Sequence, residues 1–135
     1  MDQAARTFLP EVLFVRTGHP AEFRNSDEEM HNVNVMDLDS RKQIFNVAVP
    51  FGERYVHHFD APGIFYVSCD VHPGMSAQIV ATTGPYATFA SADGQFEFRE
   101  VVPGPYTLLI YAGSQTIERS VEVAGALTTV DASVP

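Results

Sequence analysis

Short apolar runs separated by turn residues make up almost the whole of this 135-residue chain. The runs are rich in Val, Phe, Tyr and Ile, and Gly, Pro, Asn or Asp bounds each of them. Runs of this kind, recurring every eight to twelve residues or roughly so, are typical of a β-sandwich or barrel. No stretch keeps the period of an α-helix, and residues 36–43 have room for one helical turn at most. The predicted fold class is therefore all-β.

The character of the sequence changes slightly around residues 82–85, Thr-Thr-Gly-Pro, and we therefore predict two domains, residues 1–83 and 84–135. In the first domain the predicted strands are residues 11–16, 21–25, 31–36, 44–49, 54–59, 64–68 and 76–81. In the second domain they are residues 86–90, 95–101, 106–112, 116–123 and 127–132. Asp93-Gly94 lies between two of the latter runs and is a strong signal for a tight hairpin.

Composition and charge narrow the classes of partner. Hydrophobic residues make up 45% and charged residues 19% of the chain, as in ordinary globular proteins. A net charge of −9 argues against nucleic acid and anionic membranes, and is compatible with a basic partner protein. Residues 1–6 do not resemble a signal peptide, so either the protein is cytoplasmic or its export signal has been removed.

The chemistry of the chain is concentrated in the loop after predicted strand 64–68. Cys69, His72 and Met75 supply a thiolate, an imidazole and a thioether at intervals of three residues. These are the ligand types of a mononuclear copper electron-transfer site, which needs a second histidine. His31, at the start of predicted strand 31–36, is the histidine that fits, and the single Cys excludes an internal disulfide.

At this point the chain resembles the cupredoxins, the small blue copper proteins, over roughly residues 7–83. The pieces that carry the resemblance are Phe8-Leu9-Pro10, Gly18, residues 23–27, His31-Asn32-Val33, and residues 62–75 with two residues between successive ligands. The resemblance implies a Greek-key β-sandwich that binds one copper through His31, Cys69, His72 and Met75 and exchanges electrons with a redox partner protein. Asn32 resembles the asparagine with which the family ties its ligand loop to the neighbouring strand. Residues 1–6 make a poor first cupredoxin strand, so we expect that edge to be frayed.

The other polar residues have plainer interpretations. His19, His57 and His58 are interpreted as surface or packing residues rather than as a second metal site. The acidic cluster Asp27-Glu28-Glu29 is interpreted as a solvated turn, with a docking patch for a basic redox partner as the alternative.

From Pro85 onward the chain resembles part of the carboxypeptidase regulatory-like β-sandwich, on residues 92–98 and 101–108. The resemblance implies a short β-sandwich-like extension used for structure or contact, with no catalytic residues. The segment is shorter than that family's usual length, so its opening strands are missing or come from the N-terminus or another chain, which would allow a homo-oligomer. The whole arrangement resembles bacterial proteins labelled methylamine-utilization or plastocyanin-like, in which the chain would be part of a longer parent.

The predicted function is the transfer of single electrons by one type 1 copper, without a substrate. The alternative is a copper-tolerance protein that holds or hands over the metal. A domain of a multicopper oxidase or nitrite reductase is disfavoured because there is no His-x-His, and a structural adhesion module is a further alternative. Because cupredoxins usually work outside the cytoplasm, the expected location is the periplasm or another exported compartment.

Overall fold

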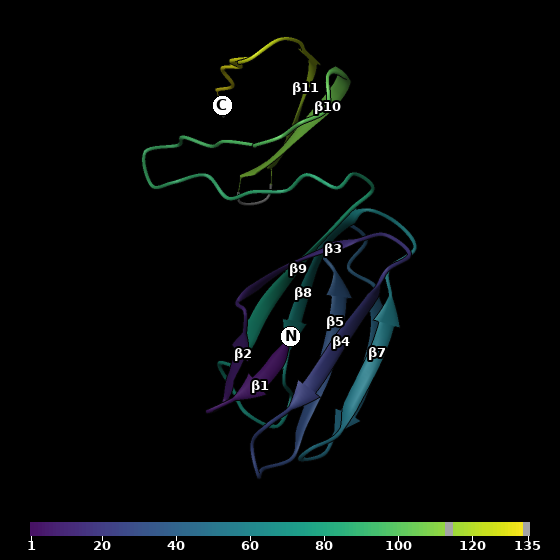
Figure 1. Ribbon diagram of the computed structural model, residues 1–135. Coiled ribbons are helices and arrows are strands. Elements are labelled where there is room, and N and C mark those ends of the chain that lie inside the picture. Colours follow the sequence, from purple (N-terminus) through teal and green to yellow (C-terminus); the bar gives the residue numbers. More distant parts are fainter. Residues whose placement is uncertain (113–114, 134–135) are drawn as a thin grey trace. The chain divides into compact units, whose positions relative to one another are not determined.

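The computed structural model describes residues 1–112 and 115–133, and Figure 1 shows its ribbon. The chain divides into two compact units, Met1–Ala87 and Thr88–Pro135. All regular secondary structure in the described residues is β-strand, which confirms the all-β prediction. Among these residues there is no helix that could cross a membrane.

Two sheets form the first unit. Its strands are β1 (Asp2–Ala4), β2 (Thr7–Leu9), β3 (Val12–Arg16), β4 (Pro20–Asn25), β5 (His31–Asp37), β6 (Gln43–Val49), β7 (Arg54–His58), β8 (Gly63–Ser68) and β9 (Ser76–Thr82). One sheet has the order β2-β1-β4-β7 (Figure 1), and the other has the order β3-β9-β8-β5-β6. The non-sequential order of both sheets is that of a Greek-key β-sandwich.

The core of this unit follows from the alternation of side chains along each strand. Phe23, Val33, Val67 and Ile79 come from β4, β5, β8 and β9, and each is at most 1% exposed. Their chain neighbours mostly face outward, because successive side chains of a strand point to opposite faces. Phe8 of β2 is also fully buried. The two sheets therefore enclose one apolar layer.

The sheet order brings the chemical residues to one end of the sandwich. Strand β5 runs antiparallel to β8, with Asn34 opposite Ser68, and β8 runs antiparallel to β9, with Ser68 opposite Ser76. The start of β5, the end of β8 and the start of β9 consequently lie together. His31 opens β5, and the loop of residues 69–75 joins β8 to β9.

The seven strands predicted before residue 83 match β3 to β9 within two residues at each end. The expected fraying of residues 1–6 is wrong. The Met1 nitrogen donates to the Glu22 carbonyl at 2.8 Å, β1 pairs with β2 and β4, and Gln3 is 1% exposed. Backbone pairing on both sides holds β1 despite its polar residues. Residues 36–43 hold a single turn, in which Arg41 N donates to the Asp37 carbonyl at 3.0 Å and Asp37 N donates to the Lys42 carbonyl at 2.9 Å.

Among its described residues the second unit has one hairpin, β10 (Gly104–Ala112) and β11 (Gln115–Val123), paired antiparallel. The strands predicted at residues 86–90, 95–101 and 127–132 are wrong. The Asp93-Gly94 turn does form, since Ser91 N donates to the Gln95 carbonyl at 2.8 Å and Gly94 has a φ of 83°. The predicted resemblance to a carboxypeptidase-like sandwich stays a prediction.

Candidate metal centre

Three side chains converge at the end of the first unit. His31, Cys69 and His72 each offer one donor atom, and the three atoms lie within 4.8 Å of one another. The two histidine Nδ1 atoms are 3.0 Å apart, and Cys69 Sγ lies 3.7 Å from Nδ1 of His31 and 4.0 Å from Nδ1 of His72. These residues lie 38 and 3 positions from Cys69, so the fold assembles the cluster.

The separations fit one metal ion. With a metal at about 2.0 Å from nitrogen and about 2.3 Å from sulfur, as in imidazole–thiolate sites, a planar arrangement has N–N and N–S edges of roughly 3.5 and 3.7 Å. The observed edges of 3.0, 3.7 and 4.0 Å are close to these values. Two imidazoles and one thiolate in a near-trigonal set are the ligands of blue copper sites.

Each histidine of the cluster contacts a carboxylate through Nε2, the ring nitrogen that faces away from the other donors. His31 Nε2 lies 2.8 Å from Asp27 Oδ2, and His72 Nε2 lies 2.8 Å from Glu29 Oε2. Because a carboxylate accepts, each Nε2 carries the proton that it donates, and a neutral ring then has its lone pair on Nδ1. Two such lone pairs facing each other at 3.0 Å beside a thiol favour a cation between them.

The three donors differ in their access to solvent. His31 is fully buried and Cys69 is 5% exposed, whereas the His72 side chain is 18% exposed. The cluster is therefore dry except at His72. This histidine is the donor through which the site reaches the surface.

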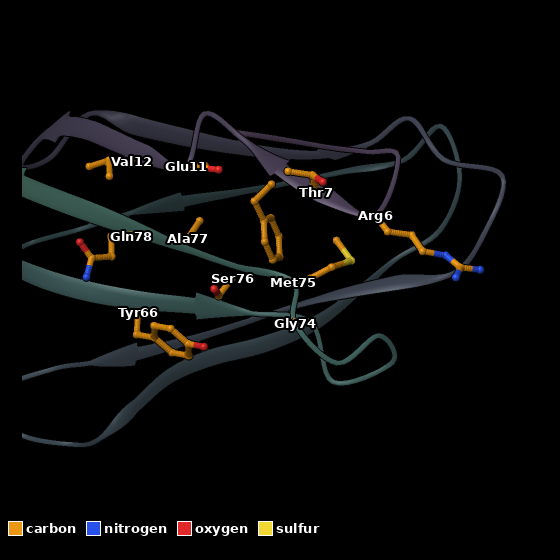
Figure 2. A pocket seen from close by; sticks show the side chains of 11 residues that line it. Arg6, Thr7, Glu11, Val12, Tyr66, Gly74, Met75, Ser76, Ala77 and Gln78 are labelled. Atoms are coloured by element: carbon orange, nitrogen blue, oxygen red, sulfur yellow. The ribbon is translucent and has the colours of Figure 1, made fainter.

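Met75, the fourth predicted ligand, closes the same loop. Cys69 N donates to the Met75 carbonyl at 3.3 Å, and Met75 N donates to the His72 carbonyl at 3.4 Å. The side chain is 4% exposed and lines a pocket together with Arg6, Thr7 and Gly74 (Figure 2). Its role as a ligand stays a prediction.

Asn32 joins the ligand strand to the residue after Cys69. Its Oδ1 accepts from Asp70 N at 2.6 Å, and its Nδ2 donates to Asp70 Oδ2 at 2.9 Å and to Asn46 Oδ1 at 2.7 Å. Hydrogen bonds from Asn34 first, then from Asn46 and Asn32, lower the pKa of the Asp70 carboxyl. These contacts are of the kind expected of the predicted supporting asparagine, a role that itself stays a prediction.

Asp27-Glu28-Glu29 lie in a surface turn, with Glu28 and Glu29 exposed, but two of the three carboxylates also bind the clustered histidines, Asp27 to His31 and Glu29 to His72. Hydrogen bonds from the Arg6 backbone and from His31 lower the pKa of Asp27, and a hydrogen bond from the Arg6 side chain lowers that of Glu29. Sequence reasoning missed these carboxylates because a run of acids is usually solvated. The available signal was their spacing, with Asp27 four residues and Glu29 two residues before His31.

The other three histidines lie outside the cluster. His19 and His58 are exposed. His57 packs its ring against Phe45 at 4.5 Å and Phe59 at 4.8 Å between centroids. Burial lowers the pKa of His57, which agrees with the interpretation of this residue as a packing residue.

Comparisons with solved structures define the class of fold. A purple cupredoxin from Nitrosopumilus maritimus is 25% identical with a TM-score of 0.52, and the match covers 58% of this chain and 84% of that one. A reduced mutant of amicyanin is 21% identical with a TM-score of 0.54, covering 60% and 78%. A copper-containing nitrite reductase from Thermus scotoductus is 27% identical with a TM-score of 0.55, covering 60% of this chain and 21% of the enzyme.

The chain thus has the cupredoxin fold, and its His31–Cys69–His72 cluster fits a type 1 copper site. No family model and no curated protein sequence matches the chain.

Proposed function

We propose that this protein is a mononuclear type 1 copper protein that carries single electrons between redox partners. The observation that carries the proposal is the convergence of two Nδ1 atoms and one thiol within 4.8 Å, with both histidines held by carboxylates. In this proposal His31, Cys69 and His72 would hold the metal, with Met75 as a weaker fourth ligand. Copper, when bound, supplies a one-electron couple.

The chain's own contribution is to hold the donors in place. His31 is buried and bonded to Asp27, while backbone hydrogen bonds close the loop between Cys69 and Met75. Donors that move little between oxidation states favour rapid electron transfer. The partly exposed His72 gives a partner protein the shortest approach to the metal.

We further propose that the protein acts outside the cytoplasm, as cupredoxins usually do, and serves a redox partner without turning over a substrate of its own. The match to the nitrite reductase supports the fold alone and not an enzymatic activity, because it covers only 21% of that enzyme's chain. Association between copies through the C-terminal strands remains part of the proposal.

The test is the spectrum and electrochemistry of the copper-loaded protein. We expect intense visible absorption from thiolate-to-copper charge transfer, a type 1 EPR signal and a reversible potential. Cys69→Ser should abolish the colour, because the thiolate supplies the band. A colour that persists in this variant would exclude the proposed site, and a colourless site that binds only Cu(I) would favour a copper-holding protein.

The proposed role of Met75 as a ligand has a separate test. Met75→Leu should leave copper bound and raise the reduction potential, because a weak thioether ligand would be lost. Met30→Leu is the matched control, since Met30 is 50% exposed and outside the proposed ligand set. An unchanged potential in Met75→Leu would show that Met75 is not a ligand.

A further inference from the structure

We propose that Glu29, clamped by Arg6, is a positioning residue for the metal ligand His72 and biases the site toward the oxidised metal. The inference rests on the proposed copper function. It concerns the one donor that reaches the surface. The Arg6–Glu29 ion pair, which lies at the surface, thereby gains a role in the metal site.

The contacts form a continuous chain from the donor cluster outward. His72 Nε2 lies 2.8 Å from Glu29 Oε2. Arg6 Nη2 donates to Glu29 Oε1 at 2.6 Å, and Arg6 Nε donates to Glu29 Oε2 at 3.0 Å. A guanidinium that binds both oxygens fixes the plane of the carboxylate, which a single contact does not.

The backbone presents Arg6 to this carboxylate at some conformational cost. Ala5 and Arg6 form the turn between β1 and β2, with φ angles of 51° and 55° that favour Gly or Asn. Asp27 offsets this cost by accepting from both backbone N–H groups, at 2.7 and 2.9 Å. The same Asp27 binds His31, so one turn and one loop hold both histidines.

Two consequences follow for His72. The carboxylate keeps the imidazole proton on Nε2, which leaves the lone pair on Nδ1, 4.0 Å from Cys69 Sγ, to bind a metal. A carboxylate bonded to a ligand imidazole also makes the ring a stronger donor, which favours the metal in its higher charge state. Arg6 moderates this charge, and it lies with Glu29 at the surface, their side chains being 61% and 46% exposed.

The experiment compares substitutions at neighbouring positions. Glu29→Gln keeps an acceptor near His72 but removes the charge, and Glu29→Leu removes both. Glu28→Gln is the matched control, because Glu28 is exposed and has no hydrogen bond to either histidine among the described contacts. Arg6→Met releases the clamp while keeping Glu29.

Two readouts separate positioning from a merely structural role. In the metal-free protein, imidazole 15N shifts report the tautomer of His72, which we expect to be Nε2–H in the wild type and a mixture in Glu29→Leu. In the copper-loaded protein, Glu29→Gln should lower the ratio of Cu(II) to Cu(I) affinity about tenfold, or raise the potential by about 59 mV. Arg6→Met should shift the potential in the opposite direction, and Glu28→Gln should change neither readout.

Equal potential shifts in Glu29→Gln and Glu28→Gln would overturn the proposal, because general surface charge would then explain the effect. An unchanged His72 tautomer in Glu29→Leu would also overturn it. Failure of the copper function has a different signature, the absence of a charge-transfer band in the wild type. The tautomer measurement on metal-free protein is independent of that outcome.

Discussion

The two units of the chain use similar strand sequences and reach different results. In Met1–Ala87 two sheets bury an apolar layer that includes Phe23, Val67 and Ile79. In the described residues of 88–133 a nine-residue strand pairs with another of nine residues, yet none of these residues is buried. The comparison shows that pairing makes a hairpin, whereas a second sheet is needed to make a core.

The energies of burial and pairing explain why the candidate metal site belongs to the first unit. Burying apolar surface contributes roughly 25 cal/mol per Å². A backbone hydrogen bond adds only about 1 kcal/mol net, and an isolated two-stranded hairpin is marginal in water. Donors that must stay fixed at separations of 3 to 4 Å therefore need the packed sandwich behind them.

The largest expected effect is a difference in amide hydrogen exchange between the units. Amides of β5 and β8 should open only with the first unit, whose unfolding costs on the order of 5 kcal/mol or more. Amides of β10 and β11 should exchange at least about a thousandfold faster, because a hairpin without a buried face opens at little cost. Equal protection in the two hairpin strands and in β5 would mean that the hairpin face is covered in solution.

A pair of core truncations gives the next largest effect. Phe23→Ala should cost about 3–5 kcal/mol, because a fully buried aromatic ring leaves a cavity. Leu109→Ala in β10 should cost less than about 1 kcal/mol, because Leu109 is 38% exposed. Urea denaturation followed by near-ultraviolet circular dichroism measures both. Similar costs for the two variants would remove the distinction between the units.

A third prediction concerns the loop that carries both carboxylates. Asn25 is 1% exposed and donates to the Glu29 and Val49 carbonyls at 2.8 and 2.9 Å. Asn25→Ala removes the side-chain donor to one buried and one partly buried carbonyl, so it should cost about 1–3 kcal/mol and weaken copper binding. Ser26→Ala is the control, expected within about 0.5 kcal/mol because its hydrogen bond to Asp2 is exposed. A cost in Ser26→Ala as large as that in Asn25→Ala would contradict this account.

The same comparison explains how much was predictable from the sequence. The strands of the first unit were predicted because alternating side chains there have a second sheet to bury against. The run of residues 95–101 alternates equally well, with Phe96 and Phe98 on one side, but forms no strand. Alternation of apolar and polar residues indicates which face of a strand can be buried. It does not indicate whether another surface is present to bury that face.

The candidate site divides in a similar way. His31, Cys69 and His72 could be predicted because their residue types and spacing carry the chemistry. Their carboxylate partners could not, because the contacts depend on the turn at Ala5-Arg6, which lacks the Asn or Gly typical of such turns. Tertiary hydrogen bonds to Asp27 supply what the local sequence lacks.

The smallest expected effect tests how well the first unit buries a polar side chain. Burial lowers the pKa of His57 in the folded state, while Asp60 raises it and His58 lowers it further. Above the ordinary value of 6.5 the ring is neutral in both states, so its titration has no effect on stability there. As the pH falls below that value, the unfolded chain binds a proton that the folded state resists, and stability decreases.

Replacing His57 by Phe should therefore remove part of the loss of stability below about pH 6.5. The effect should be smaller than those above, because solvent screens a ring that is only half-buried. Denaturation at a series of pH values measures the difference in unfolding free energy between wild type and variant. Taking this difference removes the contribution of the other histidines. His58→Phe on the exposed face of β7 is the matched control. An unchanged pH profile in His57→Phe would contradict the prediction. It would mean that water reaches the His57 ring in the folded state as freely as it reaches the hairpin of the second unit.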